Sequence, residues 1–165
     1  MPMVKVLPTA VAGLELRELR GEDAARYHEL VQRNVAHLTK LGDYQEEVAA
    51  GVEEFAELFA EPADAPVRFG VYLTDELVGR VDLVPVDPPK YGLGYWLSEA
   101  ATGRGLATTA VAALLEYAGT ELHATDVFAG VTHGNERSDA LLERLGFTVV
   151  ATFDNYRRFH RPLPR

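Results

Sequence analysis

The 165-residue sequence contains no cysteine. Disulfide bonds, thiolate metal sites and an acyl-cysteine intermediate are therefore excluded. The sequence also lacks any apolar run that approaches the roughly 20 residues of a membrane span, and its amino terminus lacks the basic flank and apolar core of a secretory signal. These absences predict a cytoplasmic protein with no membrane partner, whose chemistry does not pass through a cysteine.

Positive charge is scarce. The 16 Lys and Arg residues stand against 25 Asp and Glu residues, which gives a formal net charge of −9. This balance disfavours binding to nucleic acid and favours cationic partners, although acidity also serves solubility alone. Because 47% of the residues are hydrophobic, the chain is long enough to bury its own core, and residues 1–165 are predicted to form one domain.

The hydrophobic pattern switches repeatedly between strand-like alternation and helical spacing. Strands are predicted at residues 14–19, 67–73, 77–83, 91–97, 125–131, 147–153 and 156–163. Helices are predicted from stripes at 27–38, 48–59, 107–118 and 134–146. Pro62 is expected to stop the second helix, Gly119 to cap the end of the third, and Asn135 to cap the start of the fourth. This order predicts an α/β fold of the α+β type, a mixed sheet flanked by helices.

The stretch "TGRG" joins the strand that ends at Leu97 to the following helix. Such a loop presents unpaired backbone N–H groups at the positive end of the helix dipole, and glycine allows a phosphate to approach the backbone closely. The sequence lacks the Gly-Lys-Ser/Thr of a triphosphate P-loop and the third small residue of a dinucleotide fingerprint. A tight turn without any ligand explains the glycines equally well.

A second motif lies in "HGNERSDALLERLGF", where Asn135 and Ser138 precede Leu-Gly-Phe. On its own this motif is a capped helix start with an ordinary first-turn serine. However, local structure does not require a phosphate loop, a gap of about 30 residues, and then Asn-x-x-Ser leading to Leu-Gly-Phe. The ordered pair of motifs therefore favours a functional interpretation.

Together these motifs resemble the GNAT superfamily of acetyl-coenzyme A dependent N-acetyltransferases, in particular its RimJ/RimL-type branch. The residues that carry the resemblance are "GYWL" at Gly94 to Leu97, Gly103 to Gly105, Asn135 with Ser138, and Leu145 to Phe147. The superfamily phosphate loop, Gln/Arg-x-x-Gly-x-Gly/Ala, corresponds to Thr102 through Ala107, and Thr102 departs from it. The resemblance spans Leu14 to Leu163 and implies a GNAT-like fold with about seven mostly antiparallel strands flanked by four helices.

The resemblance also implies a reaction. An unprotonated primary amine, on a protein N-terminus or a small molecule, would attack the thioester of acetyl-coenzyme A directly. A tetrahedral intermediate would then expel the coenzyme A thiolate. No metal is implied, and RimL-type relatives suggest a homodimer. The alternative is a domain that binds or senses acyl-coenzyme A with little or no catalysis.

The resemblance places the pyrophosphate on the backbone amides from Gly103 to Thr108, with the pantetheine arm beside the strand Tyr95 to Ser98 like an added strand. Arg104 would place a positive charge near the phosphates. Trp96 would anchor the core and form one wall of the acyl site. The predicted donor-binding residues are Trp96, Leu97, Ser98, Gly103, Arg104, Gly105, Leu106, Ala107, Thr108 and Asn135.

The resemblance further suggests catalytic residues. Many superfamily members donate a proton to the leaving thiolate from a tyrosine at the position occupied here by Leu142. Ser138 lies one helical turn earlier on the same face and is predicted to replace it, while Asn135 would orient the pantetheine or the carbonyl.

The general base is harder to assign from the sequence. Asp154, in the last hairpin, is the predicted base. Asp82, Asp87, Glu99 and His133 are further candidates, although each of these residue types is usually a solvated surface group. Asn34 interrupts the apolar stripe of the first helix, which places it either toward a substrate cleft or at a polar edge.

Overall fold

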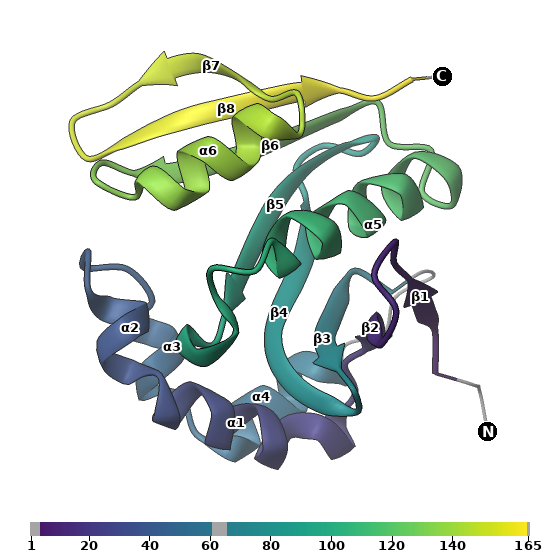
Figure 1. The fold of residues 1–165 in the computed structure, drawn as a ribbon, viewed down its shortest axis with the longest axis vertical. Coiled ribbons are helices and arrows are strands. Elements are labelled where there is room, and N and C mark those ends of the chain that lie inside the picture. Colours follow the sequence, from purple (N-terminus) through teal and green to yellow (C-terminus); the bar gives the residue numbers. More distant parts are fainter. Residues whose placement is uncertain (1–3, 61–65, 165) are drawn as a thin grey trace.

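The computed structural model describes residues 4–60 and 66–164 (Figure 1). Eight strands form one sheet in the order β1-β2-β3-β4-β5-β6-β8-β7. The strands are β1 (Val6–Pro8), β2 (Leu14–Glu18), β3 (Arg68–Leu73), β4 (Glu76–Pro85), β5 (Lys90–Leu97), β6 (Asp126–Thr132), β7 (Thr148–Thr152) and β8 (Tyr156–Pro162). The helices are α1 (Ala24–Arg33), α2 (Val35–Thr39), α3 (Gln45–Ala49), α4 (Val52–Phe59), α5 (Leu106–Thr120) and α6 (Glu136–Arg144), with short 3-10 turns η1 (Gly21–Asp23) and η2 (Glu99–Ala101).

The predicted mixed, mostly antiparallel sheet is confirmed, with β1 as an additional edge strand. Every neighbouring pair of strands is antiparallel except β5 and β6. These two run parallel and pair only where Lys90–Gly92 meets Asp126–Phe128. Beyond Gly92, β5 continues to Leu97 beside β4, while its other edge has no strand partner among the described residues. The two halves of the sheet therefore separate at the carboxyl end of β5.

The two predicted amino-terminal helices are each broken into two. Asn34 ends α1, since its side-chain Nδ2 donates to the Leu30 carbonyl while its Oδ1 accepts from the backbone N–H of Glu99. Such side-chain hydrogen bonds compete with the helix. The second break comes at Gly51, which has extended backbone angles and forms the N-cap of α4. The stop expected at Pro62 lies outside the described residues.

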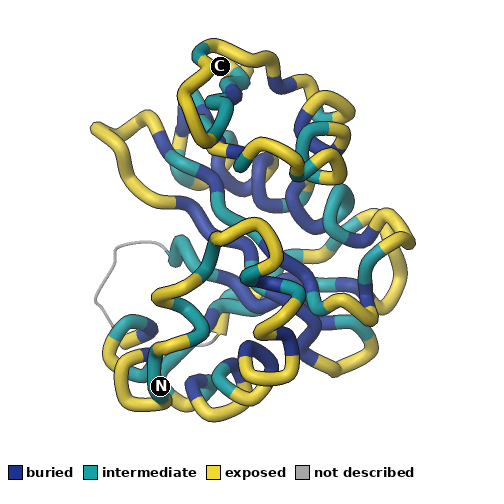
Figure 2. The backbone as a smooth tube through the Cα atoms, turned by 90° about the vertical axis from the view of Figure 1, so that its left-hand side faces the viewer, coloured by how far each residue is buried: buried dark blue, intermediate teal, exposed yellow. Residues whose placement is uncertain are grey.

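Hydrophobic residues fill two clusters on opposite faces of the sheet. Alternation along β5 sends Tyr91, Leu93 and Leu97 into the core beneath α5 and α6, whereas Trp96 packs beneath α1 to α4. Figure 2 shows buried backbone along the middle of the molecule and exposed segments at its rim. The side chains of β5 therefore point alternately toward one cluster and toward the other. In the described part of the chain, no helix is long and apolar enough to cross a membrane.

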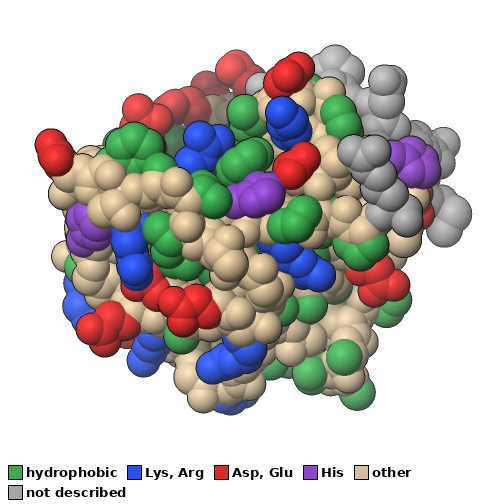
Figure 3. All heavy atoms as spheres, turned by 90° about the horizontal axis from the view of Figure 1, so that it is seen from above, with side chains coloured by type: hydrophobic (Ala, Val, Ile, Leu, Met, Phe, Trp, Pro, Cys, Tyr) green, Lys and Arg blue, Asp and Glu red, His purple; other side chains and the backbone are tan. Residues whose placement is uncertain are grey.

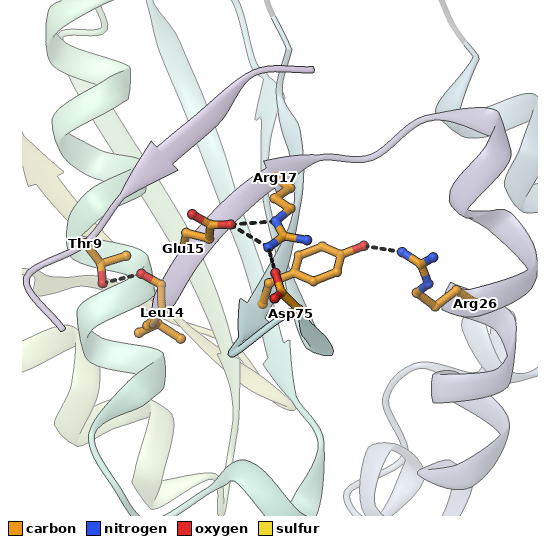
Figure 4. Close-up of polar contacts among 7 residues, drawn as sticks. Thr9, Leu14, Glu15, Arg17, Arg26 and Asp75 are labelled. Atoms are coloured by element: carbon orange, nitrogen blue, oxygen red, sulfur yellow. Dashed lines mark hydrogen bonds and ion pairs between the residues drawn. The ribbon is translucent and has the colours of Figure 1, made fainter. Parts of the chain in front are cut away.

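Near the amino-terminal edge of the sheet, the Arg17 side chain links β2 to the turn between β3 and β4. Arg17 on β2 pairs with Glu15 and with Asp75 in the β3–β4 turn, and its guanidinium lies 4.3 Å from the ring centroid of Tyr72. Arg26 donates to the Tyr72 hydroxyl from α1, as Figure 4 shows. A hollow of about 450 Å³ lies beside this group, lined by the β1–β2 turn and the β3–β4 turn. This edge lies three strands away from the separation of β5 and β6.

The predicted cap at Gly119 is wrong, because α5 continues through it to Thr120 and Gly119 does not have a positive φ. A Cβ added at Gly119 meets no described atom within 4 Å. Glycine inside a helix costs roughly 0.5–1 kcal/mol relative to alanine. We therefore expect Gly119→Ala to raise the free energy of unfolding by about 0.5 kcal/mol, measured by urea denaturation. A lower free energy of unfolding would contradict the helical assignment of this residue.

Candidate active site

The loop between β5 and α5 has the backbone of an anion site. Gly103 and Gly105 have φ angles of +81° and +74°, which side-chain-bearing residues rarely adopt. A Cβ added at either glycine meets no described atom within 4 Å, so the space beside the loop is open. Gly105 is the N-cap of α5 and supplies no side-chain hydrogen bond. The first-turn N–H groups of this 15-residue helix therefore lack a side-chain cap, and they form the positive end of the helix dipole.

The predicted phosphate-loop residues lie together around this helix start. Arg104 is exposed at its tip, Ala107 and Thr108 are partly exposed, and Leu106 has its side chain in the core and offers only its backbone. Thr102 occupies the position at which the superfamily pattern has arginine or glutamine. Its hydroxyl donates to the Glu99 carbonyl at 2.7 Å, so this side chain closes the η2 turn.

The edge of β5 that β6 leaves uncovered is tied to the helical layer. The Tyr44 hydroxyl donates to the Tyr95 carbonyl at 2.9 Å, and His37 Nε2 lies 3.1 Å from the Leu97 carbonyl. Tyr44 adopts a left-handed conformation, with φ 61°, which is uncommon for a tyrosine. An added strand along the predicted pantetheine path would thus meet two carbonyls that already accept hydrogen bonds.

The same segment between α2 and α3 also reaches β6. Both carboxylate oxygens of Asp43 lie within 2.8 Å of the Thr132 hydroxyl at the end of β6. Residues 40–44 therefore connect to both strands where they separate. We call residues 40–44 the connecting segment.

Three predicted donor-binding residues of β5 and its end are already engaged in packing. Trp96 is buried among the residues of α1 to α4, and its Nε1 donates to the Tyr27 hydroxyl at 3.1 Å. Leu97 is buried beneath α5. The Ser98 hydroxyl donates to Asn34 Oδ1 at 3.3 Å, so Asn34 is a buried structural group that fastens α1 to the end of β5.

The start of α6 brings together residues that the sequence did not connect. Asn135 caps the helix, with Oδ1 accepting from the Ser138 backbone N–H at 3.2 Å. The Ser138 side chain neighbours the Tyr95 hydroxyl, which is buried and forms no hydrogen bond with any described residue. Burial raises the pKa of Tyr95 to about 12, although the Ser138 hydroxyl offsets part of that effect. Leu142, at the usual tyrosine position, is fully buried in the core.

The sequence interpretation placed Tyr95 beside the pantetheine path but gave no role to its hydroxyl, which lies beside Ser138. The alternation of β5 indicates that Tyr95 faces away from Trp96, but only the packing of α6 shows that it meets Ser138. Asp139 lies next to them, with one oxygen paired with Arg157 and the other buried without a described hydrogen-bond partner.

The candidate bases lie in different surroundings. Asp154 is exposed in the β7–β8 turn, and Asp87 is exposed in the β4–β5 connection. Glu99 is exposed, 3.7 Å from His37 Nδ1, and His133 Nε2 lies 2.8 Å from the Phe153 carbonyl. Asp82 alone among the five candidates is buried. Figure 3 shows acidic and basic side chains interspersed on the face near β7 and β8, so the excess of acid is not gathered there into one patch.

The sequence profile of the family described as "Acetyltransferase (GNAT) domain" matches residues 13–148. The chain belongs to the GNAT acetyltransferase family. Family membership confirms the expected N-acetyltransferase activity, with acetyl-coenzyme A as the acetyl donor.

Individual GNAT proteins resemble the chain over most of its length. The putative ribosomal N-acetyltransferase YdaF of Bacillus subtilis (strain 168) is 28% identical over 143 residues, which cover 81% of this chain and 77% of that protein. The solved structure of RimL, described as a ribosomal L7/L12 alpha-N-protein acetyltransferase in complex with coenzyme A, superposes with a TM-score of 0.83 at 20% identity, covering 96% of this chain and 98% of that one. A Salmonella typhimurium acetyl transferase structure, described as modifying the N-terminal serine of L7/L12, gives a TM-score of 0.76 at 20% identity, with coverages of 97% and 100%.

Proposed function

We propose that the chain acetylates a primary amine, with the α-amine of a protein N-terminus as the first candidate acceptor. The observation that carries the proposal is the open loop at the start of α5, where two left-handed glycines leave the helix N–H groups accessible. The choice of acceptor is supported by relatives that are named for acetylation of ribosomal protein. A small amine is the alternative acceptor.

In this proposal the pyrophosphate of the donor binds the backbone from Gly103 to Thr108, with Arg104 as a cationic neighbour. The acceptor approaches from the face covered by α1 to α4. Ser138, on the opposite face, donates a hydrogen bond to the sulfur as the thiolate leaves. The Tyr95 hydroxyl beside Ser138 supplies a further donor at the place where the usual tyrosine is absent.

The test is release of free thiol from acetyl-coenzyme A against a panel of N-terminal peptides and small amines. We expect turnover with at least one peptide acceptor and a mass increase of that peptide by one acetyl group. Turnover with small amines alone would favour the alternative acceptor. Stabilisation by acetyl-coenzyme A without thiol release for any amine would indicate a binding domain instead.

We also propose that the protein acts in the cytoplasm as a homodimer, an assembly that rests on the resemblance to RimL-type proteins. Light scattering is expected to give twice the mass of one chain. A monomer at high micromolar concentration would contradict the dimer.

A further inference from the structure

Asp82 on β4 combines burial with an unsatisfied oxygen. The residue is 8% exposed, and its Oδ1 forms no hydrogen bond with any described residue. Arg80 Nε lies 3.8 Å from that oxygen and also lacks a described hydrogen bond. Buried polar atoms in folded proteins almost always have a partner, so an orphaned carboxylate oxygen calls for an explanation.

The position of this oxygen is fixed by a glycine on the neighbouring strand. Asp82 lies directly opposite Gly94 in the β4–β5 register. A Cβ built on Gly94 would lie only 2.6 Å from Asp82 Oδ1, so the carboxylate sits above the backbone of β5 in the space that a side chain would fill. Gly94 lies within the part of β5 that β6 leaves uncovered.

A carboxylate and a hydroxyl lie on opposite faces of the sheet at two adjacent residues of β5, Gly94 and Tyr95. Asp82 lies over Gly94 on the face that carries Trp96 and the helices α1 to α4. Tyr95, the next residue, sends its hydroxyl to Ser138 on the other face. An amine that enters from the first side and a thiolate that leaves on the second side would meet at this point of the strand.

Burial makes the Asp82 carboxylate more basic than usual, and the charged groups around it offset only part of that effect. Arg80 is paired with Glu47 of α3 at 2.6 Å, and Glu47 also accepts from the Tyr27 hydroxyl of α1. Arg68 of β3 lies opposite Asp82 in register, and Tyr44 contributes a hydroxyl nearby. Burial raises the pKa of Asp82 above its ordinary value, although Arg80 and Arg68 both act to lower it.

We propose that Asp82 is the general base that receives the proton the acceptor ammonium must lose before it attacks the acetyl group. This role rests on the proposed function. The ammonium gives one proton to Asp82 directly or through one water, and the neutral nitrogen forms the new C–N bond. The C–S bond then breaks, and the second proton of the nitrogen ends on the thiolate to give free coenzyme A. Asp82 returns its proton to solvent, so the reaction releases one amide, one thiol and one proton.

The test compares Asp82→Asn with the wild type across pH, using the acceptor that the wild type acetylates best. We expect kcat/KM of the variant to fall by about 100-fold near neutral pH, the lower end of what a general base contributes. The deficit is expected to close as pH rises toward the pKa of the amine, about 8 for a terminal amine or 10.4 for a lysine-like one, because solution then supplies the unprotonated acceptor. A deficit that is constant across pH would show a structural role and overturn the proposal.

Asp75→Asn is the matched control, because it removes the same charge from the exposed turn of the same hairpin. Its kcat/KM is expected to equal that of the wild type at every pH. Asp154→Asn tests the competing assignment of Asp154 as the base. If the loss of kcat/KM closes as pH rises in Asp154→Asn but not in Asp82→Asn, the proposal is overturned. If the wild type acetylates no amine, the proposed function itself fails, a result distinct from failure of the Asp82 role alone.

Stability supplies a second readout. A carboxyl whose pKa is raised by folding stabilises the protein below its ordinary pKa, and this contribution is lost as pH rises through the raised value. Asp82→Asn is therefore expected to unfold at the same or a higher temperature than the wild type at neutral pH, with affinity for acetyl-coenzyme A unchanged. Gly94→Ala tests the same idea with Asp82 in place, because its Cβ displaces the carboxylate. Unchanged kcat in Gly94→Ala would overturn the proposal.

Discussion

Replacing Gly105 by valine is expected to weaken acetyl-coenzyme A binding by about 100-fold, because the phosphates lose charge-assisted hydrogen bonds to the start of α5. Gly105 has a φ of +74° and stands at the N-cap of the helix with open space beside it. A β-branched side chain at this position fills that space and disfavours the left-handed backbone. Isothermal titration calorimetry with acetyl-coenzyme A measures the loss.

Gly13→Val is the control for backbone strain. Gly13 has a similar φ of +82° in the β1–β2 turn, and its Cβ would meet only the Thr74 hydroxyl, at 3.4 Å. Both variants are expected to lose stability by about 1–2 kcal/mol, while only Gly105→Val loses affinity for the donor. Equal donor affinity in Gly105→Val and the wild type would show that the donor phosphates do not bind at this loop.

Ser138→Ala is expected to lower kcat by at least about tenfold, which corresponds to roughly 1.4 kcal/mol of transition-state stabilisation. The Ser138 hydroxyl lies in the first turn of α6 beside Tyr95, whereas Leu142 at the usual tyrosine position has no proton to donate. A hydroxyl that donates to the departing sulfur acts on charge that develops mainly in the transition state. Donor affinity should therefore stay within about threefold of the wild type.

The helix cap itself is not altered by this substitution, since Asn135 accepts from the Ser138 backbone N–H rather than from its hydroxyl. Asn135→Ala measures the loss of the cap, which costs about 1 kcal/mol of stability, and its donor affinity is measured alongside because Asn135 is also a predicted donor-binding residue. A parallel Tyr95→Phe variant tests the neighbouring hydroxyl. If Tyr95→Phe abolishes turnover while Ser138→Ala leaves it unchanged, the proton donor is on β5 and the assignment to α6 is wrong.

Strands β2 to β8 could be predicted from sequence because each has a local signal of alternating or continuous apolar residues, and the loop could be predicted because its glycines lie beside a helix start. The break at Asn34 could not, since the groups that compete for its side chain lie 64 and 65 residues away, at Ser98 and Glu99. The edge strand β1 is only three residues long and ends in proline, which leaves too short a pattern to detect.

The same distinction between local and long-range signals applies to the site. Gly103 and Gly105 act through their own backbone, so their part in a phosphate loop is visible in the sequence. The neighbours of Tyr95 and Asp82 depend on the packing of α6 and on the register of β4 with β5. No periodicity within one element specifies these contacts, so the sequence does not single out Asp82, and its place in the last hairpin makes Asp154 the predicted base instead.

We expect the connecting segment to couple the binding of the two substrates. It holds β5 through Tyr44 and β6 through Asp43, at the place where the strands diverge. A donor that changes the spacing of these strands must strain or release those hydrogen bonds, and an acceptor that displaces the segment must loosen the strands in return. Coupling between two binding equilibria is reciprocal, so each substrate alters the affinity for the other by the same factor. The few hydrogen bonds of the connecting segment are thereby expected to affect the affinities for both substrates by the same factor.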